Sequence, residues 1–143
     1  PNLHALSEAA EEAARDYGIQ VLVSNALIDG MQKLGDILEG EHPQMDFHAG
    51  EFETSLYLWQ APDLVKTDIA KNLPPVWSNL REVFPKGARD FIEAGAPLCY
   101  LGDPAKASAE KGKRVYERLS EMLMVEVERF LQQDRSKKRG TGC

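Results

Sequence analysis

The chain has 143 residues, of which 43% are hydrophobic and 28% charged. That length and composition suit one compact domain and exclude wholesale disorder and a disulfide-stapled mini-protein. Seventeen Lys and Arg against 23 Asp and Glu give a net charge of −6, which disfavours nucleic acid as a partner because phosphate binding needs a basic surface. No apolar run approaches the roughly 18 residues that cross a bilayer, and no signal peptide opens the chain, so we expect a cytoplasmic protein without a membrane partner.

The two cysteines are too few and too far apart for a disulfide framework or a metal knuckle. Cys99 stands within the apolar stretch 97–101, and Cys143 is the last residue. We expect both to be free thiols, with Cys99 buried.

The first elements indicate an α/β protein. Apolar residues from Leu3 to Ala14 have helical spacing, and Gly18 after Tyr17 is a stop signal. The β-branched run at 19–24 has the length and composition of a buried strand. A helix, a glycine turn and a strand together form half of a parallel crossover.

The later elements are more varied. We expect a helix over 26–38 interrupted by two glycines, a loop over 39–50, a short amphipathic helix over 51–60, and an irregular, proline-broken excursion over 61–85 with at most a turn of helix near 63–66. A short strand at 98–101 precedes Asp103 and Pro104, which are typical of a helix start. That helix is expected to reach Gln133, with a buried stripe at Val115, Leu119, Leu123, Val127 and Phe130. Residues 1–133 then form the domain, and the basic tail 134–143 is expected to be disordered.

The densest chemical signal lies between positions 39 and 53. Seven of these fifteen residues can bind metal: Glu39, Glu41, His42, Asp46, His48, Glu51 and Glu53. A solvated acidic loop with incidental histidines explains the same composition, and that alternative stays open.

The segment His48-Ala-Gly-Glu-Phe-Glu-Thr-Ser55 adds geometry to this density. If a helix begins near Gly50, Glu51 and Glu53 stand in its first turn, where the helix dipole keeps carboxylates ionised. His48 could aim its imidazole over the same helix end. A histidine and a carboxylate around a divalent cation activate water or polarise a carbonyl, although capping of the helix alone would also explain both glutamates.

The stretches His48–Leu56 and Pro62–Val65, with the later stretch Leu101–Gly112, resemble the landmarks of the creatininase (creatinine amidohydrolase) family. The resemblance implies a three-layer α/β/α sandwich with a mostly parallel sheet. It also implies hydrolysis of a C–N bond in a cyclic amide or formamide. The implied cofactor is a divalent metal, zinc, manganese or iron, with two ions in a complete active site.

The resemblance also implies roles for single residues. His48 corresponds to a histidine that contacts substrate and shuttles protons, and Glu53 to a carboxylate at or beside the metal. Glu51, which is nearer to His48 in the sequence, is the alternative to Glu53 for this carboxylate and a supporting catalytic residue. Trp59 could line the substrate pocket, or belong to the core. Family members are commonly hexamers, so we expect a homo-oligomer with contacts from the long loop 66–84.

The sequence departs from the family pattern in one large respect. The family's other metal ligands, in a Glu-x-His segment followed by an Asp and in an Asn-Gly-His-Gly-Gly-Asn loop, are not present. The chain therefore resembles the C-terminal half of a family member, and we expect a missing N-terminal segment or a companion chain to complete the active site. Two alternatives stay open: an inactive module that serves in assembly, and a sugar or lactone hydrolase on the same scaffold.

Overall fold

A computed structural model describes residues 2–140, without the side chains of 26–28 and 134–140. The chain forms two compact units. The first consists of the N-terminal 30 residues and the chain from Leu119 onward, and the second of Met31–Arg118. The candidate site lies within the second unit.

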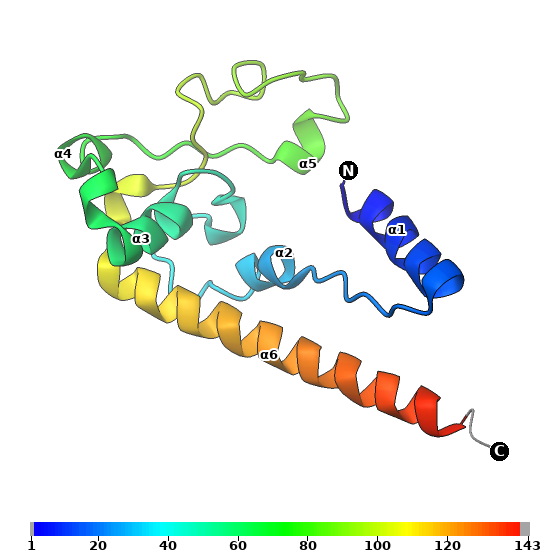
Figure 1. Ribbon diagram of the computed structural model, residues 1–143. Coiled ribbons are helices and arrows are strands. Elements are labelled where there is room, and N and C mark those ends of the chain that lie inside the picture. Colours follow the sequence, from blue (N-terminus) through cyan, green and yellow to red (C-terminus); the bar gives the residue numbers. More distant parts are fainter. Residues whose placement is uncertain (1, 141–143) are drawn as a thin grey trace. The chain divides into compact units, whose positions relative to one another are not determined.

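Helix α1 (Asn2–Tyr17) in the first unit forms where the sequence predicts it. Gly18 adopts φ +67°, and its N–H and that of Ile19 bond to the carbonyls of Ala14 and Ala13, which ends the helix. None of the side chains of α1 is buried. Helix α2 (Ala26–Met31) follows and is shorter than the helix predicted over 26–38, since residues 32–38 form turns and irregular backbone. Helix α6 (Ala109–Gly140) is one unbroken helix of 32 residues (Figure 1).

The predicted α/β/α sandwich with a mostly parallel sheet is wrong for the described residues. They are mostly helical, and their only strand pairing consists of two isolated antiparallel bridges, His48 with Leu101 and Val76 with Gly102. Residues 19–24 form no ladder, and Ile19 and Val21 are 56% and 46% exposed. A parallel strand needs neighbours and cover on both faces, and the described part of the chain provides neither for this segment.

The second unit is built from short helices joined by irregular segments. In chain order they are η1 (Pro43–Met45), α3 (Glu51–Gln60), η2 (Pro62–Leu64), α4 (Thr67–Ala70), α5 (Leu80–Val83), η3 (Pro104–Lys106) and the first part of α6. Helix α3 matches the predicted one. The excursion 61–85 contains more helix than predicted, and Pro104 begins a 3-10 turn while α6 starts only at Ala109.

The core of the second unit gathers residues that are distant in sequence. Its buried apolar side chains are Leu34, Ile37, Leu38, Phe52, Ala94, Ala96, Tyr100, Leu101 and Val115. The predicted stripe of α6 is buried at Val115, but Leu123 is 43% exposed. Cys99 is a free thiol as expected, yet it is exposed rather than buried.

The last helix runs past its expected end at Gln133 to Gly140. Cys143 lies outside the described residues, and disorder of the tail 134–143 stays a prediction. Among the described residues, no helix combines the length and the apolar character that crossing a membrane requires.

Candidate functional site

The first turn of α3 is capped by a buried carboxylate from the preceding loop. Asp46 is 2% exposed, and its Oδ2 and Oδ1 accept hydrogen bonds from the N–H groups of Glu51 (2.7 Å) and Phe52 (3.0 Å). Oδ2 also accepts the N–H of Asp103 at 3.3 Å. Burial raises the pKa of Asp46 from 3.8 to about 6, against the lowering effect of the three donors. Asp46 thus joins the start of α3 to the segment around Asp103.

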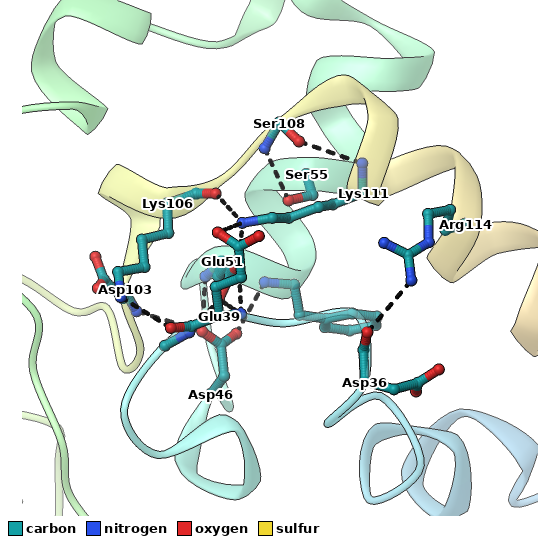
Figure 2. A network of polar contacts seen from close by, with 12 residues as sticks. Asp36, Glu39, Asp46, Glu51, Ser55, Asp103, Lys106, Ser108, Lys111 and Arg114 are labelled. Atoms are coloured by element: carbon teal, nitrogen blue, oxygen red, sulfur yellow. Dashed lines mark hydrogen bonds and ion pairs between the residues drawn. The ribbon is translucent and has the colours of Figure 1, made fainter.

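Glu51 is the most enclosed ionisable residue of this region, with 0% exposure. Its carboxylate accepts the N–H of Glu39 at both oxygens and the N–H of Gly40 at 2.8 Å. Lys111 of α6 lies 2.5 Å from Glu51 Oε1 and 2.9 Å from a carboxylate oxygen of Glu39 (Figure 2). Glu51 is therefore fully engaged inside the protein, which favours a structural role over direct contact with a substrate.

Lys111 supplies the positive charge of this network. It is 8% exposed, and its ammonium group also donates to the carbonyl of Lys106 at 2.7 Å. Burial alone would lower the pKa of Lys111, but the hydrogen bonds to Glu51 and Glu39 raise it above its ordinary value. Three acceptors satisfy the three N–H donors of the ammonium group, as burial of a charge requires.

Helix α6 begins against α3 through small residues. Ser108 caps α6 by accepting the N–H of Lys111, and its own N–H donates to Ser55 Oγ at 3.2 Å. A Cβ on Gly112 would lie 2.0 Å from the carbonyl oxygen of Ser55, so glycine is required at this contact. The close approach brings Lys111 within reach of Glu51.

His48 and Glu53 face each other on the outer side of α3. His48 Nδ1 lies 3.6 Å from Glu53 Oε2, and the two side chains are 49% and 41% exposed. Glu53 Oε2 also accepts the N–H of Ala49 at 2.6 Å, and Ala49 adopts φ +47°. The His48 ring stacks on Phe91 with centroids 5.2 Å apart. A carboxylate and an imidazole are thus held together and accessible.

An apolar pocket opens beside this pair. Its volume is about 640 Å³, and His48, Glu53, Tyr57, Ile69, Leu98 and Cys99 are among the residues that line it. Its other walls come from η2, α4 and the segment 98–104. The pocket therefore places two groups capable of acid and base chemistry at the edge of an apolar recess.

The structure separates the four predicted site residues. His48 and Glu53 come together in the pocket, whereas the Glu51 carboxylate is buried in the network with Lys111. The Trp59 ring packs on Tyr116 with centroids 4.8 Å apart and is not among the residues that line the pocket. This favours the packing alternative for Trp59, and the chemical roles of all four residues stay predictions.

The described residues do not form a complete metal centre. Among them, no three His, Cys, Asp or Glu side chains are placed to hold one ion. His48 and Glu53 provide two candidate ligands, while catalytic zinc sites need three from protein. Of the other metal-capable residues, Glu39 pairs with Lys111, and His42 packs edge-on against Trp77 with centroids 5.5 Å apart. A bound metal would need ligands from outside the described residues.

Sequence reasoning did not assign roles to Asp46 and Lys111. Asp46 was counted among the metal-capable residues, and Lys111 stands in the stretch Leu101–Gly112. The spacing of the sequence does not indicate which groups either side chain contacts. The apolar walls of the pocket were also missed. Residues 64–73 have no regular period, and the strand predicted at 98–101 is wrong, since of these residues only Leu101 forms a bridge. In the sequence, the one indication of the site was that His48 and Glu53 stand on either side of an expected helix start at Gly50.

Comparisons with known proteins give a family match and two relatives. The profile described as creatinine amidohydrolase matches residues 1–127. A protein of Mycobacterium ulcerans (strain Agy99), named mycofactocin precursor peptide peptidase, is 40% identical over 73 residues, 50% of this chain and 28% of the relative. A protein of the same name from Mycolicibacterium smegmatis is 38% identical over 76 residues, 52% of this chain and 29% of the relative. The matched stretch thus spans less than a third of the length of these relatives, and no solved structure matches the chain.

Proposed function

This chain belongs to the creatininase family, and from that premise we propose that it forms part of a hydrolase in which His48 and Glu53 meet a C–N amide bond. The observation that carries the proposal is the 3.6 Å approach of His48 Nδ1 to Glu53 Oε2 at the edge of the apolar pocket. Hydrolysis of an amide needs a group that takes a proton from water and returns one to the leaving nitrogen. An accessible imidazole beside a carboxylate meets that need.

In this proposal His48 moves the proton and Glu53 supports it. The imidazole accepts a proton from the attacking water and later donates one to the departing amine. The Glu53 carboxylate is close enough to stabilise the positive charge that the ring gains. Stacking on Phe91 and the backbone bridge to Leu101 restrict where the ring can lie.

The lining of the pocket bears on the substrate. Its walls are mainly aliphatic and aromatic side chains, among them Leu64, Val65, Ile69, Leu73 and Leu98. An amide flanked by apolar side chains, such as a peptide amide, fits this lining better than a sugar or a small polar ring, since those would leave their polar groups unpaired. Both relatives are named as peptidases of a precursor peptide, which agrees with a peptide substrate. A cyclic amide or formamide is the alternative substrate, and a lactone or sugar the less favoured one.

We further propose that a divalent metal, zinc, manganese or iron, completes the site with ligands from another segment or a companion polypeptide. Such an ion would supply a Lewis acid for the carbonyl. Denaturing mass spectrometry of the active preparation should then show polypeptide beyond this chain, and elemental analysis a stoichiometric divalent ion. An active preparation that contains this chain alone and no metal would contradict this part of the proposal.

The direct test of the proposed function is substitution of the pair. His48→Ala and Glu53→Gln should each abolish hydrolysis of a peptide or cyclic amide without changing the oligomeric state. The matched controls are His4→Ala and Glu8→Gln, because that exposed pair on α1 has the same residue types and the same 3.6 Å separation but lies outside the pocket. Full activity after either substitution at the pocket would contradict the proposal.

The alternative function is a module that serves only in oligomer assembly, hexameric as is common in the family. It predicts that oligomers persist in the double variant His48→Ala, Glu53→Ala and that the complete protein hydrolyses no amide. If either single substitution abolishes turnover while the oligomers stay intact, the assembly-only function is excluded.

A further inference from the structure

We propose that Asp46 is a positioning residue for the His48–Glu53 pair, because its buried carboxylate joins the loop before α3, the first turn of α3 and the segment 101–103. The inference rests on the proposed function, since positioning affects catalysis only if this pair meets the substrate. Its structural part can be tested without turnover.

The hydrogen bonds of Asp46 connect three separate segments. Its two oxygens accept from the N–H groups of Glu51 and Phe52 in α3, and Oδ2 also accepts from the N–H of Asp103. Asp46 stands two positions before His48, and Glu53 lies one residue beyond Phe52 in the same turn of α3. One carboxylate therefore fixes both the start of the helix that carries Glu53 and the loop that carries His48.

Two glycines make room for this carboxylate. A Cβ on Gly50 would lie 2.4 Å from Asp46 Oδ2, and a Cβ on Gly102 would lie 2.1 Å from the same atom. On Gly102 it would also come within 2.9 Å of the Cα of Gly50, so the loop and the segment around residue 102 are in direct contact. Neither position has space for a side chain while Asp46 holds its place.

The third segment reaches His48 directly through the backbone. Leu101 donates its N–H to the carbonyl of His48 at 2.7 Å, and its own carbonyl accepts the N–H groups of Phe47 and His48 at 3.1 and 3.2 Å. Displacement of residues 101–103 would therefore shift His48. Because Asp46 anchors Asp103 two residues further on, its removal should disturb both members of the pair.

The test compares two variants that disturb the carboxylate in different ways. Asp46→Asn keeps the shape of the side chain but directs an amide N–H₂ towards backbone donors. Gly50→Ala leaves every charged group in place and presses a methyl group on Asp46 Oδ2; the φ of −86° at Gly50 accommodates alanine. If one variant does not fold, the other still decides the question.

The controls separate positioning from general stability. Asp36→Asn removes the same charge from a carboxylate that faces Arg118 at the surface, 2.9 Å away. Val115→Ala weakens the core at a side chain that is 0% exposed and makes none of the Asp46 contacts. Thermal unfolding and circular dichroism identify which variants are folded and how far each is destabilised.

The readout is NMR of the His48 imidazole in the full chain. In the wild type, stacking on Phe91 should shift the NMR signals of the His48 ring protons. We expect that shift, and the nuclear Overhauser contacts between the two rings, to be lost in Asp46→Asn and in Gly50→Ala and to persist in both controls. Unchanged His48 signals in a folded Asp46→Asn or Gly50→Ala protein, or an equal loss in Val115→Ala, would overturn the inference.

Turnover of the complete enzyme forms a separate arm of the experiment. Loss of a supporting group typically reduces activity about 10- to 100-fold, and we expect a reduction of that size in kcat for Asp46→Asn, with a smaller effect on KM. If the His48 signals move as expected while turnover is unchanged, the positioning stands and the proposed function fails. If they do not move, the positioning fails whatever the activity.

Discussion

Lys111 Nζ lies 2.5 Å from Glu51 Oε1, although the two residues are 60 positions apart in the chain. Both are buried, so neither charge has water as a substitute partner. We expect Lys111→Met to lower the free energy of unfolding by about 3–5 kcal/mol, because it leaves the buried Glu51 carboxylate without a cation. Glu51→Gln should lower it less, because the exposed Glu39 still pairs with Lys111. Chemical denaturation measures these losses.

The double variant Glu51→Gln, Lys111→Met should lose much less stability than the sum of the two single losses, since it leaves no lone buried charge and Glu39 is exposed to water. The same substitutions at Glu82 and Lys86, an exposed pair 3.6 Å apart, serve as the control and should change stability little. Additive losses at Glu51 and Lys111 would show that the contact does not couple them.

The packing of α6 on α3 predicts opposite results for two glycine substitutions. Gly112→Ala places a methyl group 2.0 Å from the carbonyl oxygen of Ser55, so it should lower the free energy of unfolding by about 1–3 kcal/mol. Gly35→Ala is the matched control, because a Cβ there meets no atom within 4 Å. It should be neutral or slightly stabilising through the unfolded chain. Equal melting temperatures of the two variants would contradict the described contact.

The pKa of Asp46 gives its contribution to stability a defined pH dependence. Burial raises this pKa from 3.8 to about 6, so the folded protein holds the proton more tightly than the unfolded chain. The contribution is then fully present below about pH 4 and is lost as the pH rises through about 6. Over this pH range, the free energy of unfolding of the wild type should fall by up to about 3 kcal/mol relative to that of Asp46→Asn.

A ¹³C titration of the Asp46 carboxyl group in the folded protein should have its midpoint near pH 6. Asp36 provides the internal control, since its hydrogen bond with Arg118 lowers its pKa and its contribution is lost as the pH falls. A midpoint near pH 3.8, the ordinary pKa of an Asp carboxyl group, would contradict the raised pKa of Asp46.

The exposure of Cys99 predicts its chemistry. Cys99 lines the pocket beside His48, so iodoacetamide should alkylate it in the native protein. The experiment uses a Cys143→Ser background, and peptide mass spectrometry locates the adduct. A bulky maleimide adduct should block turnover of the complete enzyme, whereas Cys99→Ser should retain it. Resistance of Cys99 to alkylation until the protein unfolds would contradict its described exposure.

Local signals in the sequence predicted the local structure well. Gly18 marked the end of α1, and Gly50 and Pro62 marked the limits of α3. The convergence of His48 and Glu53 followed from their positions around the same helix end. Phe52 and Val115 are buried as the apolar stripes of their helices predicted, whereas Leu34 and Leu38 are buried beyond the end of α2 and not on the helix predicted over 26–38. In each of these cases the informative residues lie within a few positions of one another.

The failures concern partners that lie far away in the chain. The run 19–24 has the composition of a strand, but composition does not supply the neighbour that a strand must bond to. Glu51 has the position of a helix-capping carboxylate, and only the fold reveals that Lys111 neutralises it. The pocket walls come from η2, the short helix α4 and the segment 98–104, and no apolar period in these stretches of the sequence indicated which side chains would turn inward.

The bridge between His48 and Leu101 has a consequence for biosynthesis. The loop it closes must be complete, and Lys111 must have left the ribosome, before Glu51 can be neutralised. We expect nascent chains arrested before that point to expose the Glu51 carboxylate and the apolar side chains of the pocket, and therefore to bind chaperones and proteases more readily than the folded protein.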